Sequence, residues 1–512
     1  MDLAARIFSC LLALTVALAA GGASAQARAA PEDRAPDLVL RGAMSGADHQ
    51  RYRLLPFQVP AGTARITVQF EYGGREEKTT IDLGLLGPDG FRGQDGFRGW
   101  SGGNKAEFTV SATDATPSYA PGPIRAGTWS LLLGIPNIRK DAGADYTARI
   151  WFGGERDPYW QPSVANPPLR EEAAWYRGDL HMHDAHSDGS CRSQGGRKVP
   201  CPLFLTAQAA AARGLDFVAV TDHNTTSQAN AIRELQPYFD RLLLVPGREI
   251  TTFSGHANLI GPVAPLDFRV VEGGRDWNAL LREAAALRGV VSINHPVRPS
   301  GEICMGCGWT ARPQADPALL QAVEVVNGMD ADTPYSGIPF WESLLNAGHR
   351  LTAIGGSDNH DAGQRQAGAG GGPVGMPTTV VRASALSIPA LLEGLRAGHA
   401  FVDVQGSRDR RLEVDARSGT ARAGMGDALA VAPGATADFV VRVGNAAGGR
   451  VEVVRDGVVI APIDAPGIEG AEQELRFSWR GDGKPHWLRV DVRGGDGKLW
   501  LLGNPVYLEV GR

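Results

Sequence analysis

The middle of the chain alternates short apolar segments with longer amphipathic ones, and this alternation restricts the possible fold most. Apolar segments of strand length lie at residues 217–220, 242–245, 290–293, 322–326 and 351–354. Helical patterns fall between several of them, at residues 204–213, 277–288 and 339–347. This order favours parallel strands joined by helical crossovers, as in a barrel. We therefore predict an α/β barrel domain at residues 177–403.

The regions on either side of this domain have a β pattern. Short runs of alternating apolar and polar residues are separated there by turns rich in glycine, proline and aspartate. Such a pattern is typical of β-sandwiches, and a chain of 512 residues is long enough for three domains. We predict an N-terminal β-sandwich at residues 37–155, a linker at 156–176 and a C-terminal β-sandwich at 404–512.

The first 25 residues have the composition of a secretory signal peptide. Arg6 precedes an apolar run at residues 8–20, which is too short to span a bilayer. Ala23-Ser24-Ala25 matches a cleavage site. We predict that residues 1–25 are a signal peptide and that the mature protein is periplasmic or secreted, without a membrane anchor after cleavage.

Nine histidine and acidic side chains accompany the predicted strands of the central region. They are His181, His183, Asp188, His223, Glu249, His256, His295, Asp358 and His360. Most stand at or just past the C-terminal end of an apolar segment, where barrel enzymes place their sites. Residues two apart on a strand face the same side, so His181 and His183 can reach a common centre. Six imidazoles and three carboxylates exceed the needs of one ion and predict two or three divalent ions.

The motifs around these residues resemble the PHP (polymerase and histidinol phosphatase) superfamily. In chain order they are Gly178-Asp-Leu-His-Met-His183, Ser187-Asp-Gly189, Thr221-Asp-His-Asn224, Gly247-Arg-Glu-Ile-Thr251, Gly255-His-Ala-Asn258, Asn294-His-Pro296 and Gly356-Ser-Asp-Asn-His360. Within the superfamily the chain is most similar to the CehA/McbA-type metallohydrolases. One departure is Asp184, where such proteins commonly carry threonine. The resemblance implies a distorted (β/α)7 barrel, so the expected fold class is this barrel flanked by two β-sandwiches.

By the same resemblance, the nine ligands divide among three ions. One ion would be held by His181, His183, Glu249 and Asp358. A second would be held by Asp188, His223 and His360, and a third by Glu249, His256 and His295, so that Glu249 bridges two ions. Zinc, manganese and iron all suit imidazole and carboxylate ligands.

The resemblance also implies a hydrolase that acts on ester bonds. The first hypothesis is a phosphoesterase, for phosphodiesters or phosphomonoesters, that uses a metal-activated hydroxide, because an ion cluster suits an anionic substrate. Asp358 could orient or deprotonate the attacking water. Arg248 and Arg298 are close in sequence to ligands and are candidates for substrate binding, with a structural role in ion pairs as an equal alternative.

Two other functions stay open. The same ligands would serve a carbamate or carboxylic-ester hydrolase, and a protein of this domain order could instead bind metal or glycan without catalysis. The net charge of −5 gives no general affinity for nucleic acid. From the hydrolase hypothesis we expect a small ester as the partner, and an anionic one if it is a phosphoester. The oligomeric state stays open.

Four cysteines lie outside the predicted signal peptide, at positions 191, 201, 304 and 307. An even number in an oxidising compartment favours two disulfides, with three possible connectivities. The alternative is a structural zinc site, because Cys304 and Cys307 have ligand spacing.

Overall fold

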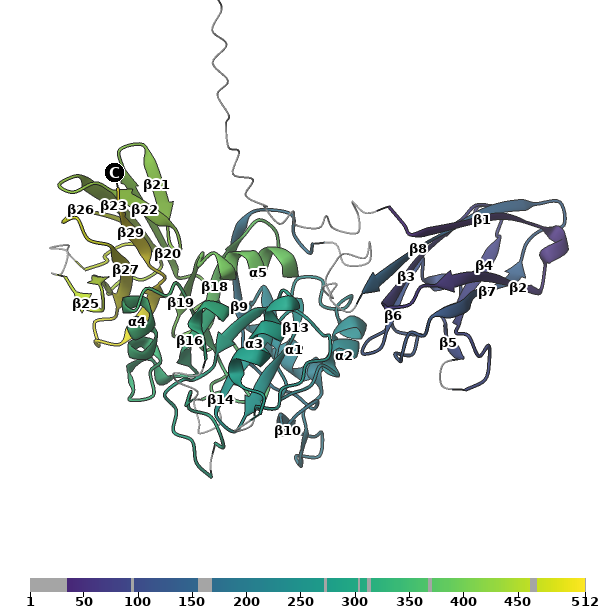
Figure 1. Ribbon diagram of the computed structural model, residues 1–512, viewed down its shortest axis with the longest axis horizontal. Coiled ribbons are helices and arrows are strands. Elements are labelled where there is room, and N and C mark those ends of the chain that lie inside the picture. Colours follow the sequence, from purple (N-terminus) through teal and green to yellow (C-terminus); the bar gives the residue numbers. More distant parts are fainter. Residues whose placement is uncertain are drawn as a thin grey trace, which may run out of the picture.

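The computed structural model describes residues 35–93, 96–154, 168–270, 274–302, 304–310, 315–366, 371–460 and 467–511. The predicted signal peptide and most of the predicted linker lie outside these residues. An N-terminal β region, a central region of strands and helices, and a C-terminal β region follow one another (Figure 1). Within the described ranges, no helix is both long enough and apolar enough to cross a membrane.

The N-terminal region consists of two antiparallel four-stranded sheets. Their orders are β1-β8-β3-β6 and β2-β7-β4-β5. The strands are β1 (Leu38–Ser45), β2 (Arg51–Val59), β3 (Thr63–Tyr72), β4 (Thr80–Leu86), β5 (Phe97–Trp100), β6 (Glu107–Ser111), β7 (Gly127–Asn137) and β8 (Gly143–Gly154). Alternate residues of both sheets, among them Val68 on β3 and Leu83 on β4, are buried in one apolar core.

The central region is built on one sheet, whose strands carry the candidate ligands. They are β9 (Ala174–Asp179), β12 (Phe217–Val220), β13 (Leu243–Thr252), β14 (Gly255–Ile260), β15 (Val290–Ile293), β16 (Ala322–Asn327), β17 (Thr352–Gly356), β18 (Thr378–Ala383) and β19 (Ala400–Asp403). The order is β17-β16-β15-β14-β13-β12-β9-β18-β19. Strand β12 is parallel to β9 and β13, and β16 is parallel to β15 and β17, whereas β14 is antiparallel to both its neighbours. A separate hairpin is formed by β10 (Ser190–Arg192) and β11 (Lys198–Pro200).

Five α-helices lie between or after these strands. They are α1 (Leu203–Arg213), α2 (Gln228–Leu235), α3 (Trp277–Ala286), α4 (Ile338–Asn346) and α5 (Ile388–Arg396). Asp276 and Ser387 begin α3 and α5 by accepting a hydrogen bond from a backbone N–H of the first turn. Helix α1 ends at Gly214, whose φ of 76° is left-handed. Helices α1, α3 and α4 lie where the sequence predicts helices.

The C-terminal region continues the central sheet. Its strands are β20 (Arg411–Ser418), β21 (Ala421–Gly424), β22 (Ala428–Val431), β23 (Thr436–Gly444), β24 (Arg450–Arg455), β25 (Val458–Val459), β26 (Glu472–Arg480), β27 (His486–Arg493), β28 (Leu499–Gly503) and β29 (Val506–Val510). Strand β19 pairs with β28, so one sheet crosses the boundary predicted at residue 404. A second sheet has the order β21-β20-β23-β26.

The strand order through the central sheet is an open path in the part of the chain that the structure describes. An isolated parallel bridge between Met182 and Asn359 joins the segments that follow β9 and β17, but no ladder between these two strands closes a ring. The distorted (β/α)7 barrel flanked by two β-sandwiches therefore stays a prediction of fold class.

A buried ion cluster joins the N-terminal region to α2. Asp114 lies between Arg65, with N···O at 2.9 Å, and Arg233 of α2, with N···O at 2.7 Å. Asn230 of α2 also exchanges hydrogen bonds with the backbone of Thr113 and Ala115. Burial alone would raise the pKa of Asp114, but the two guanidinium groups hold that pKa well below its usual range.

Replacing Asp114 by Asn should destabilise the protein, because both arginines would lose their buried counter-charge. We expect the free energy of unfolding in urea to fall by about 3 kcal/mol at neutral pH. Asp114 has a lowered pKa in the folded state, so its stabilisation is present above the usual carboxyl pKa and is lost as the pH falls. The difference between wild type and Asp114→Asn should therefore shrink below about pH 4. The control is Asp89→Asn, which removes an exposed ion pair with Arg125, and equal losses in the two variants would contradict the prediction.

Candidate metal centre

The strand ends of the central sheet bring all nine predicted ligands into one cluster. His181 and His183 follow β9, and His223 follows β12. Glu249 lies within β13, and His256 lies on β14 beside Thr251 of β13. His295 follows β15, and Asp358 and His360 follow β17. Most of these positions are the C-terminal ends of strands, so chain direction in the sheet is what gathers the ligands.

Glu249 is the centre of the cluster. Its carboxylate oxygens lie 3.5 Å from Nε2 of His181 and of His183, 2.8 Å from Nδ1 of His223, 3.2 Å from Nδ1 of His256 and 3.3 Å from Nε2 of His295. Burial alone would raise the pKa of Glu249, but His181, His223 and His256 hold that pKa well below its usual range. The carboxylate is therefore ionised and shared among five imidazoles.

Asp358 contacts two of the same imidazoles. Its Oδ1 lies 3.4 Å from Nε2 of His181 and 3.2 Å from Nε2 of His183. Burial lowers the pKa of His183 to about 4, so this ring is neutral and able to act as a ligand at neutral pH. His181 and His183 thus lie between two buried carboxylates.

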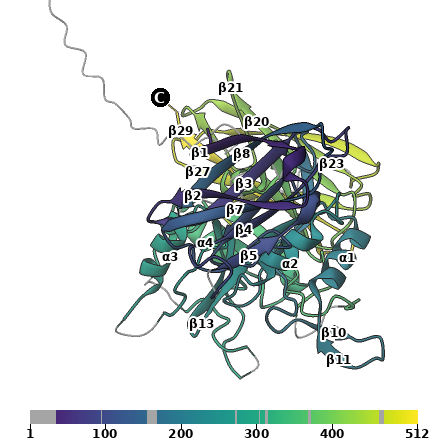
Figure 2. The ribbon, with the colours of Figure 1, turned by 90° about the vertical axis from the view of Figure 1, so that its right-hand side faces the viewer.

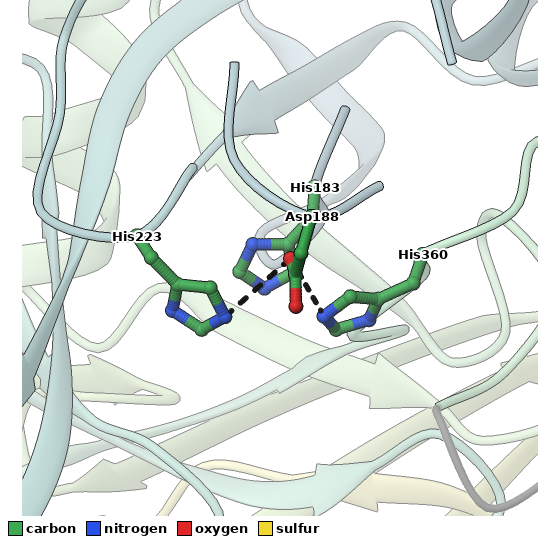
Figure 3. Close-up of side chains that lie close together, drawn as sticks. All are labelled: His183, Asp188, His223 and His360. Atoms are coloured by element: carbon green, nitrogen blue, oxygen red, sulfur yellow. Dashed lines mark ion pairs between the residues drawn. The ribbon is translucent and has the colours of Figure 1, made fainter. Parts of the chain in front are cut away.

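A second group of ligands lies at the solvent-facing end of the cluster. His183, Asp188, His223 and His360 point toward one another (Figure 3). Oδ1 of Asp188 lies 3.6 Å from Nε2 of His223 and 3.4 Å from Nε2 of His360. The Asp188 side chain is 59% exposed, whereas that of His181 is 1% exposed. The cluster therefore has a closed end at His181 and an open end at Asp188.

The separations between the donor atoms suit ligands of a shared divalent ion better than direct hydrogen bonds between those atoms. Atoms bound to one tetrahedral ion at about 2.0–2.1 Å lie about 3.4 Å apart, which matches the separations of 3.2–3.5 Å between Glu249 or Asp358 and the imidazoles of His181 and His183. Within the described ranges, Nε2 of His181, Nε2 of His183 and Oε2 of Glu249 are buried without a hydrogen-bond partner. Buried polar atoms are normally satisfied, so an ion shared by these three residues would account for them.

Two residues of the cluster have left-handed backbones. His295 has a φ of 25° and Asp358 a φ of 51°. This conformation is uncommon for residues with a Cβ, and it persists where the surrounding structure imposes it. Here it turns the chain sharply at the ends of β15 and β17, so that the side chains face the centre.

Glu324 supports the cluster and was not among the residues predicted from the sequence. It is buried on β16 and accepts a hydrogen bond from Nδ1 of His181 at 2.9 Å. Its other oxygen accepts from the backbone N–H of His295 at 2.9 Å. Nε2 of His181 faces Glu249 and Asp358. Glu324 therefore binds the opposite nitrogen of the ring and orients Nε2 toward the centre of the cluster. The signal in the sequence was an acidic residue within the apolar run of 322–326.

Asp179, the last residue of β9, holds two ligand-bearing segments together. It is fully buried and accepts hydrogen bonds from the backbone N–H groups of His181, Ser357 and Gly375. The N–H of Asp358 donates in turn to the carbonyl of His181 at 2.8 Å. These bonds fix the segment after β9 against the segment after β17.

Arg248 does not face the cluster, which corrects its candidacy for substrate binding. Neighbouring residues of a strand point to opposite faces, and Glu249 takes the inward face. Arg248 is buried and donates to the carbonyls of Pro262 at 3.1 Å and Ala264 at 2.5 Å. Burial lowers the pKa of Arg248 to about 10. Its role is structural.

Arg298 lies at the edge of the cluster. It forms an ion pair with Asp330 at 2.6 Å and donates to Oδ1 of Asn327 at 2.8 Å. Nδ2 of Asn327 lies 3.3 Å from Oδ2 of Asp358. Arg298 therefore reaches Asp358 through Asn327, and it helps to orient that carboxylate.

The cysteines form one disulfide in place of the two predicted. Cys304 and Cys307 are bonded, whereas Cys191 and Cys201 are free and buried. The bonded pair also excludes a structural zinc site made of four thiolates.

Comparison with protein-family models finds no match, and neither does comparison with curated proteins. One similar solved structure is a two-domain protein from Bacteroides vulgatus that contains a predicted PHP-like metal-dependent phosphoesterase. It is 17% identical over 67% of this chain and 96% of that chain, with a TM-score of 0.35. A xylanase from Cellvibrio japonicus is 9% identical over 48% of this chain and 46% of that chain, with a TM-score of 0.14. At these TM-scores, neither likeness bears on the fold or the function of the chain.

Replacing Glu324 by Gln should weaken metal binding without unfolding the protein. The variant keeps the shape of the side chain but removes the negative charge that makes His181 a better ligand. We expect the affinity for Zn²⁺ to fall about ten- to a hundredfold, measured by competition with a chromogenic chelator. Glu71→Gln removes an exposed carboxylate from the N-terminal region and should leave the affinity unchanged. Unchanged affinity in Glu324→Gln would refute this role for Glu324.

Proposed function

We propose that the chain is an exported, metal-dependent hydrolase of the PHP superfamily, of the CehA/McbA type, that acts on phosphoric esters. The observation that carries the proposal is the cluster of nine candidate ligands, with Glu249 and Asp358 at its centre and an end open to solvent at Asp188. The order of the motifs along the chain supports the superfamily. Two or three divalent ions, of zinc, manganese or iron, would be held by His181, His183, Asp188, His223, Glu249, His256, His295, Asp358 and His360.

Bound ions would supply Lewis acidity and would activate water for attack on the ester at neutral pH. In this proposal Asp358 would orient or deprotonate that water. Burial alone would raise the pKa of Asp358, but His181, His183 and His360 hold that pKa well below its usual range. Asn327 fixes the second oxygen of the carboxylate, and Arg298 fixes Asn327. The carboxylate is thus ionised and oriented before the substrate arrives.

A cationic hairpin beside the open end supports an anionic substrate. The segment 190–200 contains Arg192, Arg197 and Lys198 and no acidic residue, and all three side chains are exposed. Ser190, the first residue of β10, donates its N–H to the carbonyl of His360 at 2.6 Å. Figure 2 shows the β10–β11 hairpin projecting from the central region. Its charge would attract a phosphoester toward Asp188 and His360.

An apolar rim supports a second candidate, the hydrolysis of aryl carbamates or carboxylic esters. The rim consists of exposed apolar side chains on the loops that follow β13, β15 and β16. They are Phe253, Val297, Met305, Met329 and Tyr335. Exposed apolar residues of this kind can mark a binding surface, and they would suit an aromatic group on either kind of ester.

Metal analysis, combined with assays on an aryl phosphomonoester, an aryl phosphodiester and a naphthyl carbamate, tests the proposal. We expect bound divalent metal and turnover of at least one phosphoester. His181→Ala should lower the metal content and abolish turnover, because His181 lies between Glu249 and Asp358. His49→Ala, an exposed histidine of the N-terminal region, should retain both. Turnover of the carbamate alone would overturn the phosphoesterase proposal, and full metal content with full activity in His181→Ala would overturn the site.

The double variant Arg197→Glu/Lys198→Glu should bind phosphoesters less well. Reversal of two charges beside the open end should raise KM for the phosphoester about tenfold at low salt, with a smaller effect at high salt. The KM of a neutral ester should not change. Arg139→Glu/Lys140→Glu makes the same change at an exposed pair of the N-terminal region and serves as control. Equal effects on charged and neutral esters would count against electrostatic attraction by the hairpin.

A further inference from the structure

The disulfide loop Cys304–Cys307 lies against His256 of the metal centre. The carbonyl of Met305 lies 3.2 Å from Nε2 of His256. Gly306 accepts a hydrogen bond from the N–H of Gly255 at 2.9 Å, and a Cβ at Gly306 would collide with the carbonyl of Thr252. The loop is therefore fitted closely against the turn between β13 and β14.

The two sulfur atoms of the disulfide have different surroundings. Cys307 is fully buried, whereas Cys304 is partly exposed. One ligand atom each from His256, His295 and Cys307 lie within 4.8 Å of one another. Nδ1 of His295 is also buried and has no hydrogen-bond partner among the residues that the structure describes. The Cys307 sulfur thus lies beside two imidazoles of the centre, and Cys304 is the more exposed half of the disulfide.

Cys307 is held in place by contacts that do not involve the disulfide. Gly306 is bound to Gly255 on one side. On the other side, the N–H of Gly308 donates to Oγ of Ser300 at 2.9 Å, and the N–H of Trp309 donates to the carbonyl of Pro296 at 2.8 Å. Breaking the sulfur–sulfur bond would therefore leave Cys307 beside His256 and His295.

We infer that the Cys304–Cys307 disulfide masks a further protein ligand, the Cys307 thiolate, for an ion held by His256 and His295. The inference rests on the proposed metal centre. Two imidazoles and one thiolate form a donor set that suits zinc, and a thiolate is a far better ligand than a disulfide sulfur. The disulfide is then a redox switch that changes the ligands of one ion.

A dithiol reductant would operate the switch in two exchange steps. A thiolate of the reductant attacks the accessible Sγ of Cys304, a mixed disulfide forms, and Cys307 leaves as a thiolate. The second thiol of the reductant then attacks the mixed disulfide, loses its proton to solvent and releases Cys304, which takes up a proton. The reductant is oxidised to its own disulfide, and the protein gains two electrons. The Cys307 thiolate would occupy a coordination position otherwise open to water or substrate, so the reduced protein should turn over esters more slowly.

Cobalt substitution tests the inference, because thiolate ligation gives Co²⁺ a near-ultraviolet charge-transfer band that nitrogen and oxygen ligands do not give. The full-length protein is loaded with Co²⁺ before and after treatment with a phosphine reductant that is then removed. We expect the band only after reduction. Cys304→Ser should show it without reduction, because Cys307 is already free, and Cys307→Ser should never show it. Cys191→Ser/Cys201→Ser, which removes the free thiols, should behave like wild type.

The outcomes separate this inference from the proposed function. Visible Co²⁺ bands with no charge-transfer band in reduced wild type or in Cys304→Ser would overturn the switch and leave the metal centre standing. A band that persists in reduced Cys307→Ser, or that disappears in Cys191→Ser/Cys201→Ser, would assign the thiolate elsewhere and would also overturn it. Failure of every form to bind Co²⁺ would overturn both proposals.

Discussion

The burial of Glu249 among five imidazoles is the interaction on which the central region depends. An ionised carboxylate without exposure to water is costly unless charges or hydrogen bonds compensate it. Glu249 meets this requirement with side chains from the ends of β9, β12 and β15 and from β14, as well as a hydrogen bond from Nδ2 of Asn294 at 2.9 Å. These strands must therefore be in register for the carboxylate to be stable. Bound metal ions would make this alignment of the strands still more important, because coordination bonds would then replace the weak imidazole–carboxylate contacts.

The ligands are kept in place by a layer of buried polar groups behind them. Asp179 binds three backbone N–H groups, and Glu324 holds both His181 and the backbone of His295. Asn294 joins Glu249 to Asn258, which in turn donates to the carbonyl of Leu180. Each of these groups links two different segments of the central region. The hydrogen bonds that hold the candidate ligands in place therefore also hold neighbouring strands together. A preformed site of this kind loses little conformational entropy when an ion binds.

The sequence indicated the ligands well because they follow apolar strands, and chain direction sends the ends of parallel strands to one edge. It did not indicate Glu324. The role of this residue depends on its hydrogen bond with Nδ1 of His181, and the two residues are 143 positions apart in the chain. The sequence left the role of Arg248 open, and its place beside Glu249 in β13 puts its side chain on the opposite face, where it donates to buried carbonyls. The cysteine pairing could not be derived either, since it depends on the path of the loop after β15, where Cys304 and Cys307 are bonded. Contacts between distant segments, and not residue types, are what the sequence left open.

This division also explains why the chemistry of the site is easier to infer than its substrate. Most of the candidate ligands belong to buried strand ends, which leave a recognisable apolar pattern in the sequence. The groups that would meet a substrate belong to exposed loops, where the same position accepts many residues. The β10–β11 hairpin contributes positive charge on the side of Asp188 and His360, and the rim from Phe253 to Tyr335 contributes apolar surface on the side of His256 and His295. An anionic ester with an apolar group would contact both at once, whereas a neutral ester would use only the rim. Under the proposed function, the balance between these two surfaces, and not the ligand set, would decide which ester the centre binds.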